Sequence, residues 1–92
     1  MRTRLTLISL FFVIIATAQS YNDFCRQGLE SIKQNQFDEA SLCFEKAVAQ
    51  SSNDREKIYA LANLAYSHQV SGNLVKALDS YDKALKIAPE EI

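Results

Sequence analysis

The sequence predicts an all-α protein in which two antiparallel helix pairs follow one another along the chain. Only two glycines and one proline occur in 92 residues, too few for the many turns of a β-sandwich or barrel. Apolar residues recur at the spacing of amphipathic helices, and the pattern of one half recurs in the other at a fixed offset of 37 residues. At this length the chain holds one small domain at most.

Residues 1–20 differ from the remainder and have the layout of a secretory signal peptide. Arg2 and Arg4 come first, Leu5–Ala18 carries no charge, and small residues close the segment. We expect a signal peptide over residues 1–18, or as far as residue 20. The alternatives are a buried helix and an uncleaved anchor, for which the apolar stretch is short of the roughly 20 residues of a span. The predicted location is exported, periplasmic or extracellular, with membrane contact only through the leader.

The first helix pair is predicted over residues 21–54. Its first helix keeps apolar and small residues at helical spacing, namely Tyr21, Phe24, Gly28, Leu29 and Ile32. The polar stretch that follows ends this helix, with Asn35 as the expected left-handed residue. The second helix begins near Phe37 and buries Ala40, Phe44, Ala47 and Val48.

The second pair is predicted over residues 58–91, after a helix start at Asn53. Asn53 and Glu56 have the spacing of a capping box. Gly72 supplies the positive φ of the turn between the two helices, and Pro89 ends the last helix because proline lacks an N–H. The inner stripes are Ile58, Leu61, Leu64 and Ala65 in the first helix, then Leu74, Ala77, Leu78, Tyr81, Ala84 and Leu85 in the second.

The two pairs match position by position. The offset of 37 residues pairs Phe37 with Leu74, Ala40 with Ala77, Phe44 with Tyr81, and Ala47 with Ala84. The alanines of these pairs, together with Gly28 and Ala65, are small enough to let neighbouring helices approach closely. The aromatic residues fill the space that they leave.

This pattern resembles the tetratricopeptide repeat (TPR), which runs W-x-x-L-G-x-x-Y, then a small alanine, an aromatic residue and a closing proline. The first copy has Phe24, Gly28, Ala40, Phe44 and Ala47 at these places, and the second has Leu61, Leu64, Ala65, Ala77, Tyr81, Ala84 and Pro89. Gln27, Ser31, His68 and Ser52 depart from the pattern, and the offset exceeds the usual repeat of about 34 residues. An ordinary four-helix bundle would explain the stripes but not the duplication.

The resemblance implies a non-enzymatic scaffold that binds a peptide or protein segment on the concave face of a TPR-type α-solenoid. By the layout of that family, the first helix of each pair lines this face. The candidate binding residues are Asn22, Leu29, Lys33, Tyr59, Tyr66 and Gln69, with Cys25 and Ala62 between them. The two tyrosines are the strongest candidates, because aromatic side chains offer a large contact area at low entropic cost. The alternative is that they pack against a neighbouring helix.

Two repeats are fewer than the three or so that such arrays need for independent stability. The stripe on the last helix is therefore expected to lie open unless a partner, a second copy or further repeats cover it. In an alternative interpretation the chain is the N-terminal piece of a longer sensor or enzyme whose catalytic domain lies beyond Ile92.

The sequence contains no pattern that predicts an enzyme, a cofactor or a metal. His68 is the only histidine and stands at a packing position, and no serine lies in a nucleophile motif. Loss of the leader removes Arg2 and Arg4 and lowers the net charge from −1 to −3. That charge argues against a nucleic-acid partner, since such proteins carry a clustered basic excess.

The two cysteines, Cys25 and Cys43, leave two possibilities open. An even number of cysteines in an exported chain permits a disulfide. The two residues lie at similar distances from the turn near Asn35, so antiparallel helices would place them at similar heights. Such a bridge would add roughly 3 kcal/mol by closing a short loop. The other possibility is a pair of small buried thiols.

Overall fold

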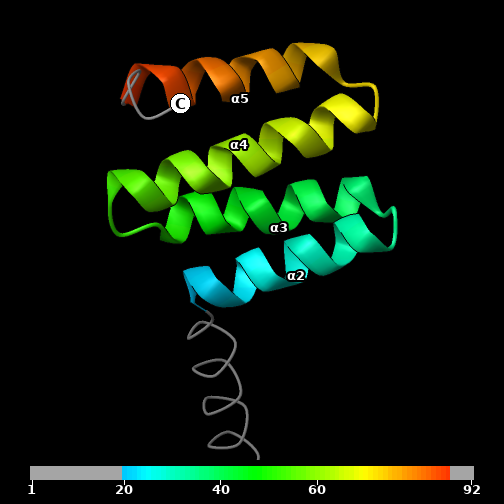
Figure 1. Ribbon diagram of the computed structural model, residues 1–92, viewed down its shortest axis with the longest axis horizontal. Coiled ribbons are helices and arrows are strands. Elements are labelled where there is room, and N and C mark those ends of the chain that lie inside the picture. Colours follow the sequence, from blue (N-terminus) through cyan, green and yellow to red (C-terminus); the bar gives the residue numbers. More distant parts are fainter. Residues whose placement is uncertain (1–19, 88–92) are drawn as a thin grey trace, which may run out of the picture.

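The computed structural model describes residues 20–87, and this part of the chain is all-helical (Figure 1). Its helices are α2 (Tyr21–Lys33), α3 (Phe37–Gln50), α4 (Asp54–Val70) and α5 (Leu74–Ile87). The predicted helical class and the expected helix start at Phe37 are therefore confirmed. The predicted leader and Pro89 lie outside the described residues.

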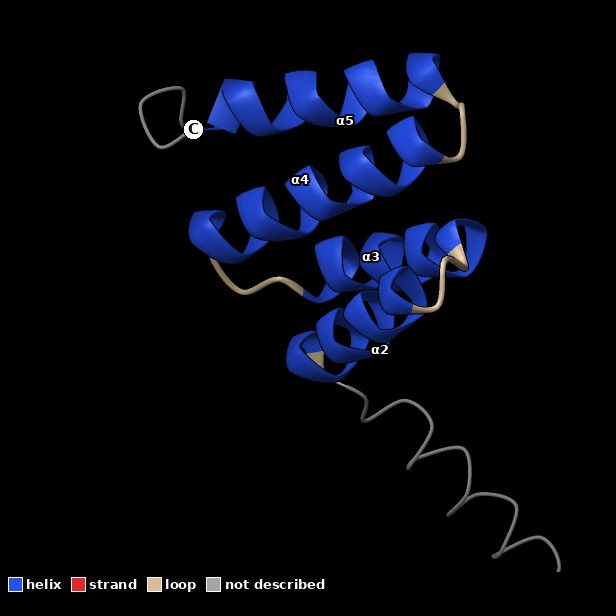
Figure 2. Cartoon of the chain, turned by 45° about the vertical axis from the view of Figure 1, so that its right-hand side comes forward, coloured by secondary structure: helices blue, strands red, loops and turns tan. Residues whose placement is uncertain are grey.

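The helices stack in sequence order, each antiparallel to the one before it, as both ribbon views show (Figures 1 and 2). α2 packs against α3, α3 against α4, and α4 against α5. The inner helices α3 and α4 therefore have a packing partner on two sides. Within the described residues, α5 packs extensively against α4 alone.

The helix ends follow from local side-chain and backbone chemistry. The Oδ1 atom of Asn53 accepts a hydrogen bond of 2.9 Å from the backbone N–H of Glu56, which caps α4 as predicted. The Glu56 carboxylate does not return to Asn53 as a full capping box requires. It accepts a hydrogen bond of 2.9 Å from the backbone N–H of Ser52 instead. A complete capping box stands at the start of α2, where Ser20 and Asp23 cap each other.

The two turns within the pairs have the same backbone conformation and the same hydrogen bond. Asn35 and Gly72 adopt the predicted positive φ angles, +60° and +88°. In each turn the next residue donates its backbone N–H to a carbonyl five residues earlier, Gln36 to Ser31 and Asn73 to His68, both at 2.8 Å. These donors and acceptors are separated by the repeat offset, so the duplication extends to the backbone hydrogen bonds.

The core lies where small residues meet one aromatic ring. Phe44 of α3 is fully buried, and a Cβ atom added to Gly28 of α2 would stand 2.6 Å from its ring. Glycine is therefore required at position 28 while the ring keeps this place. Around them the core contains Cys25, Ala40, Ala47, Ala60, Leu61, Leu64 and Ala84. The predicted small positions Ala40, Ala47, Ala65, Ala77 and Ala84 are all buried.

Candidate interaction surfaces

The six predicted binding residues are all exposed. Tyr59 and Tyr66 of α4 are 45% and 42% exposed, and Leu29 of α2 is 38% exposed; Asn22, Lys33 and Gln69 are exposed as well. We call these six residues the first-helix face. Cys25, which the TPR layout places among them, is instead buried in the core, and Ala62 is half-buried.

The first-helix face is divided between two helices, which the hydrogen bond from the Tyr21 hydroxyl of α2 to the Glu56 carbonyl of α4 joins. Its α2 and α4 members lie on helices that each pack against α3 (Figure 2). The ring of Tyr66 is held edge-on against Phe37 of α3, with 6.5 Å between the ring centroids. Tyr66 therefore presents a supported ring, and aromatic pairs of this geometry add stability beyond their buried area.

A second exposed surface runs along the last helix. Leu74, Leu78 and Leu85 are 60%, 69% and 45% exposed, and Tyr81 is 36% exposed. We call these four residues the α5 stripe. Their spacing of four, three and four residues places them on one side of the helix. Of the six residues predicted for this stripe, Ala77 and Ala84 are buried, and the other four lie open in the described part of the chain.

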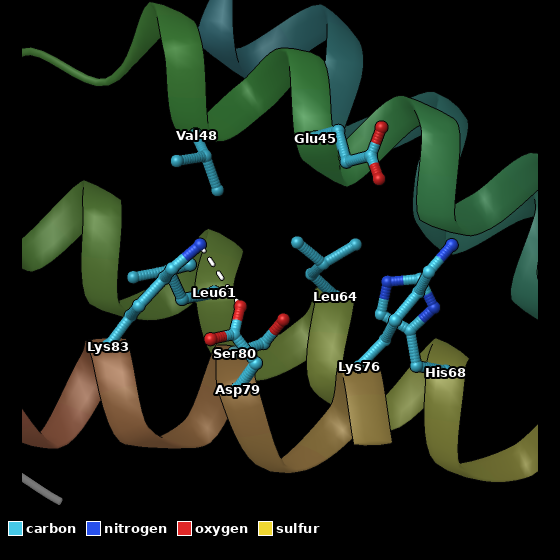
Figure 3. Close-up of a pocket in the computed structure, with 9 residues that line it drawn as sticks. All are labelled: Glu45, Val48, Leu61, Leu64, His68, Lys76, Asp79, Ser80 and Lys83. Atoms are coloured by element: carbon cyan, nitrogen blue, oxygen red, sulfur yellow. Dashed lines mark ion pairs between the residues drawn. The ribbon is translucent and has the colours of Figure 1, made fainter. Parts of the chain in front are cut away.

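A pocket of about 400 Å³ opens between α3 and α5, with α4 as its floor (Figure 3). Val48, Leu61 and Leu64 give it an apolar side, and the buried His68 lies at one end. Glu45 of α3 faces Lys76 of α5 across the pocket, and Lys83 pairs with Asp79 at 3.1 Å. Such a pocket can hold an apolar side chain beside a polar one. Its charged members are exposed and stabilise the fold little.

Four groups of α2 and α3 have perturbed pKa values. The hydrogen bond from the Ser20 backbone lowers the pKa of the Asp23 carboxyl, and the other three values are raised. Burial raises the pKa of the Tyr21 phenol above its ordinary value of 10.0, and its O–H donates a 3.0 Å hydrogen bond to the carbonyl of Glu56. Burial likewise raises the pKa of the Cys25 and Cys43 thiols above 9.0. A raised thiol pKa disfavours the reactive thiolate, so neither cysteine has the character of a nucleophile.

The two cysteines are free thiols in the structure. Cys25 is buried in the cluster that contains Phe44, whereas Cys43 is half-buried. Cys43 precedes Phe44 by one residue and therefore points about 100° away from it around α3. Similar heights on antiparallel helices place the two residues level, but they do not turn the two side chains toward each other.

Several features of the surfaces were not foreseen from the sequence. Ser67 and Ser80 are buried polar residues, and the Ser67 hydroxyl donates a 2.9 Å hydrogen bond to the carbonyl of Asn63. Ala60 is fully buried without belonging to the predicted stripe of α4. The small size of Ala60 and Ser67, seven residues apart, is the signal that could have placed them on a packed side of the helix.

Within residues 20–87 no group of His, Cys, Asp and Glu lies close enough to hold a metal ion. In the same range no helix is long and apolar enough to cross a membrane.

Comparison with known proteins gives one result. A family model described as "Domain of unknown function (DUF6340)" matches residues 26–91, which include most of α2 and all of α3, α4 and α5. No curated protein and no solved structure matches the chain significantly.

Proposed function

We propose that this chain, which belongs to the DUF6340 family, is a non-enzymatic, TPR-type module that binds a protein or peptide segment. Two features support the TPR assignment. The extensive helix contacts all join neighbours along the chain, which suits a solenoid better than a closed bundle. The repeat offset also relates the two turns and the small core positions, as duplicated helix pairs require.

The exposed tyrosines of α4 are the observation that carries this proposal. Tyr59 and Tyr66 are seven residues apart on one side of the helix and remain more than two-fifths exposed. Exposed aromatic residues on a rigid helix are typical anchors of protein interfaces. The contact between Tyr66 and Phe37 fixes one of these rings before any partner arrives, which lowers the entropic cost of binding.

A display selection tests the proposal. Peptides are selected against the full chain, and the best one is titrated against Tyr59→Ala, Tyr66→Ala and Val75→Ala variants. We expect the tyrosine variants to lose tenfold or more in affinity, because interface anchors of this kind contribute about 2 kcal/mol or more. The Val75→Ala variant is the matched control, since Val75 is 80% exposed on α5 and lies outside both the first-helix face and the α5 stripe. Equal affinities of all the variants would remove the first-helix face from the proposal.

We further propose that the module works after export, in the periplasm or outside the cell. The support is the basic start, apolar segment and small-residue exit of residues 1–20. Mass spectrometry of the exported fraction tests this point, and we expect a mature chain that begins at residue 19 or residue 21. An exported chain that still begins with Met1 would contradict it.

A further inference from the structure

We infer that the α5 stripe is a docking site for an amphipathic helix that resembles α4 on the side by which α4 covers α3. This inference rests on the proposed interaction function and names the chemistry of one partner. The helix would present small residues, alanine or serine, seven positions apart. It would lie across Leu74, Leu78, Tyr81 and Leu85 as α4 lies across α3.

The internal repeat shows what covers a stripe at this position. An offset of 37 residues relates the α5 stripe to Phe37, Ser41, Phe44 and Val48 of α3. Phe44 and Ser41 are buried, and Phe37 and Val48 are half-buried. Phe37 meets Tyr66 of α4 and Val48 lines a pocket with Leu61 of α4, while the Phe44 ring lies against Gly28 of α2. The α5 stripe is thus the same surface one repeat further on. In the described part of the chain Tyr81 reaches Gln69 of α4, and the three leucines of the stripe remain 45% to 69% exposed.

The side of α4 that meets α3 defines the partner. Gln69 marks the side that meets α5, because its Oε1 accepts a hydrogen bond of 3.3 Å from the Tyr81 hydroxyl. Ala60 precedes Gln69 by nine residues, and Ser67 follows Ala60 by seven, so both lie about 180° around the helix from Gln69. Both are completely buried. Small side chains thus let α4 approach α3 closely.

The α5 stripe is more apolar than the equivalent surface of α3, and we expect it to bind a helix of the same kind as α4. Leu78 stands where α3 has Ser41, and Leu74 stands where α3 has Phe37. A helix with small facing residues can approach these protruding leucines as closely as α4 approaches α3, which keeps the contact close-packed. An alanine- or serine-faced helix has this property.

The charges beside the stripe are also repeated. Glu45 of α3 faces Lys76 of α5 across the pocket of Figure 3, on the far side of α4. Its equivalent on α5 is Asp82, which is exposed and paired only with Lys86 of its own helix, at 3.1 Å. Asp82 could therefore face a basic residue of the partner, placed next to its docking helix, as Glu45 faces Lys76.

A second copy that stacks head to tail does not meet these requirements. Its first helix, α2, has Asp23 and Glu30 where α4 has Ala60 and Ser67. Asp23 already caps α2 with Ser20 and pairs with Arg26. Burial of these two carboxylates against the leucines of α5 would be costly, because charges need polar partners when they leave water. The partner is therefore a different helix of the α4 type.

A titration with a synthetic peptide of residues 53–71 tests this inference. The labelled peptide is added to the full chain, and its binding is followed by fluorescence anisotropy. The matched control peptide carries Ala60→Asp and Ser67→Glu, the residues that α2 has at the equivalent positions. The chain is tested as wild type, as Leu78→Glu, and as Val75→Glu. Val75 is 80% exposed beside the stripe, so its variant makes a similar change outside the docking site.

We expect the 53–71 peptide to bind the wild type and the Val75→Glu variant alike. Binding to Leu78→Glu, and binding of the control peptide to the wild type, should each weaken at least about tenfold, since each would bury a carboxylate. Circular dichroism and urea unfolding of the Leu78→Glu variant verify its fold, which should be intact because Leu78 is largely exposed. The inference stands only if all these differences appear.

Four results would overturn it. Equal binding to the Leu78→Glu variant would mean that the peptide displaces α4 from α3 instead of covering α5. Equal binding of the control peptide would remove the requirement for small residues, and an absence of binding would remove the partner altogether. Light scattering that shows a dimer broken by Leu78→Glu would make a second copy the occupant. The tyrosine variants of the first-helix face test the proposed function separately, so the two failures are distinguishable.

Discussion

The two helix pairs carry the same pattern, yet they bury it differently. Phe44 in the first pair is fully buried, while its repeat equivalent Tyr81 is 36% exposed. The difference lies in the neighbours, because α3 packs between α2 and α4 whereas α5 meets only α4 among the described helices. A repeat sequence therefore specifies a face that is suited to packing, and the next helix decides whether that face is buried.

The closest packing shows a second difference between the pairs. The first pair needs Gly28, because the Phe44 ring occupies the place of a Cβ atom. The second pair has Ala65 at the equivalent position, where its methyl group is fully buried. The pair whose aromatic ring is fully buried thus has the smaller facing residue, which leaves room for that ring.

The largest expected effect separates the two aromatic positions. Phe44→Ala should lower the free energy of unfolding by about 3–5 kcal/mol, because it leaves a cavity in a fully buried site. Tyr81→Ala should cost about 1 kcal/mol, since its ring is partly in water already. Urea unfolding followed by circular dichroism measures both values. Similar losses at the two positions would mean that α5 is covered in solution and would end the contrast between the pairs.

The next effect concerns the small residues. Gly28→Ala should destabilise by about 1–3 kcal/mol, because the added methyl group would displace a buried ring. The reciprocal change Ala65→Gly should cost about 1 kcal/mol through the greater freedom of the unfolded backbone and the lost methyl contacts. Thermal and urea unfolding of the two variants provide the comparison. A stabilised Gly28→Ala variant would contradict the close approach of α2 to Phe44.

A smaller effect is expected where the second pair begins. Asn53→Ala should cost about 1 kcal/mol, because it removes the oxygen that accepts from the Glu56 N–H at the start of α4. Asn53→Asp is the matched control, since aspartate also caps helices well and should retain most of the stability. Both are measured by the midpoint of urea unfolding. Equal losses in the two variants would show that the cap does not stabilise α4.

The last prediction concerns how the free energy of unfolding depends on pH, and its groups all lie in the first helix pair. This effect is the smallest near neutral pH and grows as the pH rises. Burial raises the pKa values of Tyr21, Cys25 and Cys43 in the folded chain. Below pH 9 both folded and unfolded chains keep these protons, so stability is unaffected. Above the ordinary thiol value of 9.0 the unfolded chain loses its protons first, and the free energy of unfolding should fall.

Urea unfolding between pH 7 and pH 10.5 measures this decline. A Cys25→Ala, Cys43→Ala double variant should show a shallower decline than the wild type, because only the Tyr21 phenol and the exposed groups then titrate. An unchanged slope would contradict the raised thiol pKa values. Titration of the unfolded, unreduced wild type should also find two free thiols, as in the structure.

The predictable part of this protein is mostly local. The roles of Asn35 and Gly72 followed from residue type and position, because a left-handed backbone favours asparagine and glycine. The cap at Asn53 followed from the spacing of Asn53 and Glu56, although Glu56 turned to Ser52 instead. The cap at Ser20 was not predicted, because that residue lies at the predicted boundary of the leader.

The candidate surfaces were predictable in outline only. Tyr59 and Tyr66 are exposed, as expected for residues that lie outside the predicted inner stripe of α4. The burial of Cys25 does not agree with its place in the TPR layout, because a small apolar thiol on the edge of a helix face can turn either way. The pocket beside His68 combines residues of three helices, and no spacing along one helix predicts such a combination.

The sequence by itself determined the helical class, the position of the turns, the small residues of the core and the duplication. These depend on local backbone preferences and on residue volume, which a short window of sequence contains. Only the tertiary structure decided which stripe is covered, how α4 divides its sides between α3 and α5, and that Cys25 lies in the core while Cys43 is half-buried. Burial and pairing depend on which helix lies alongside, and that neighbour is set by packing between residues far apart in the chain.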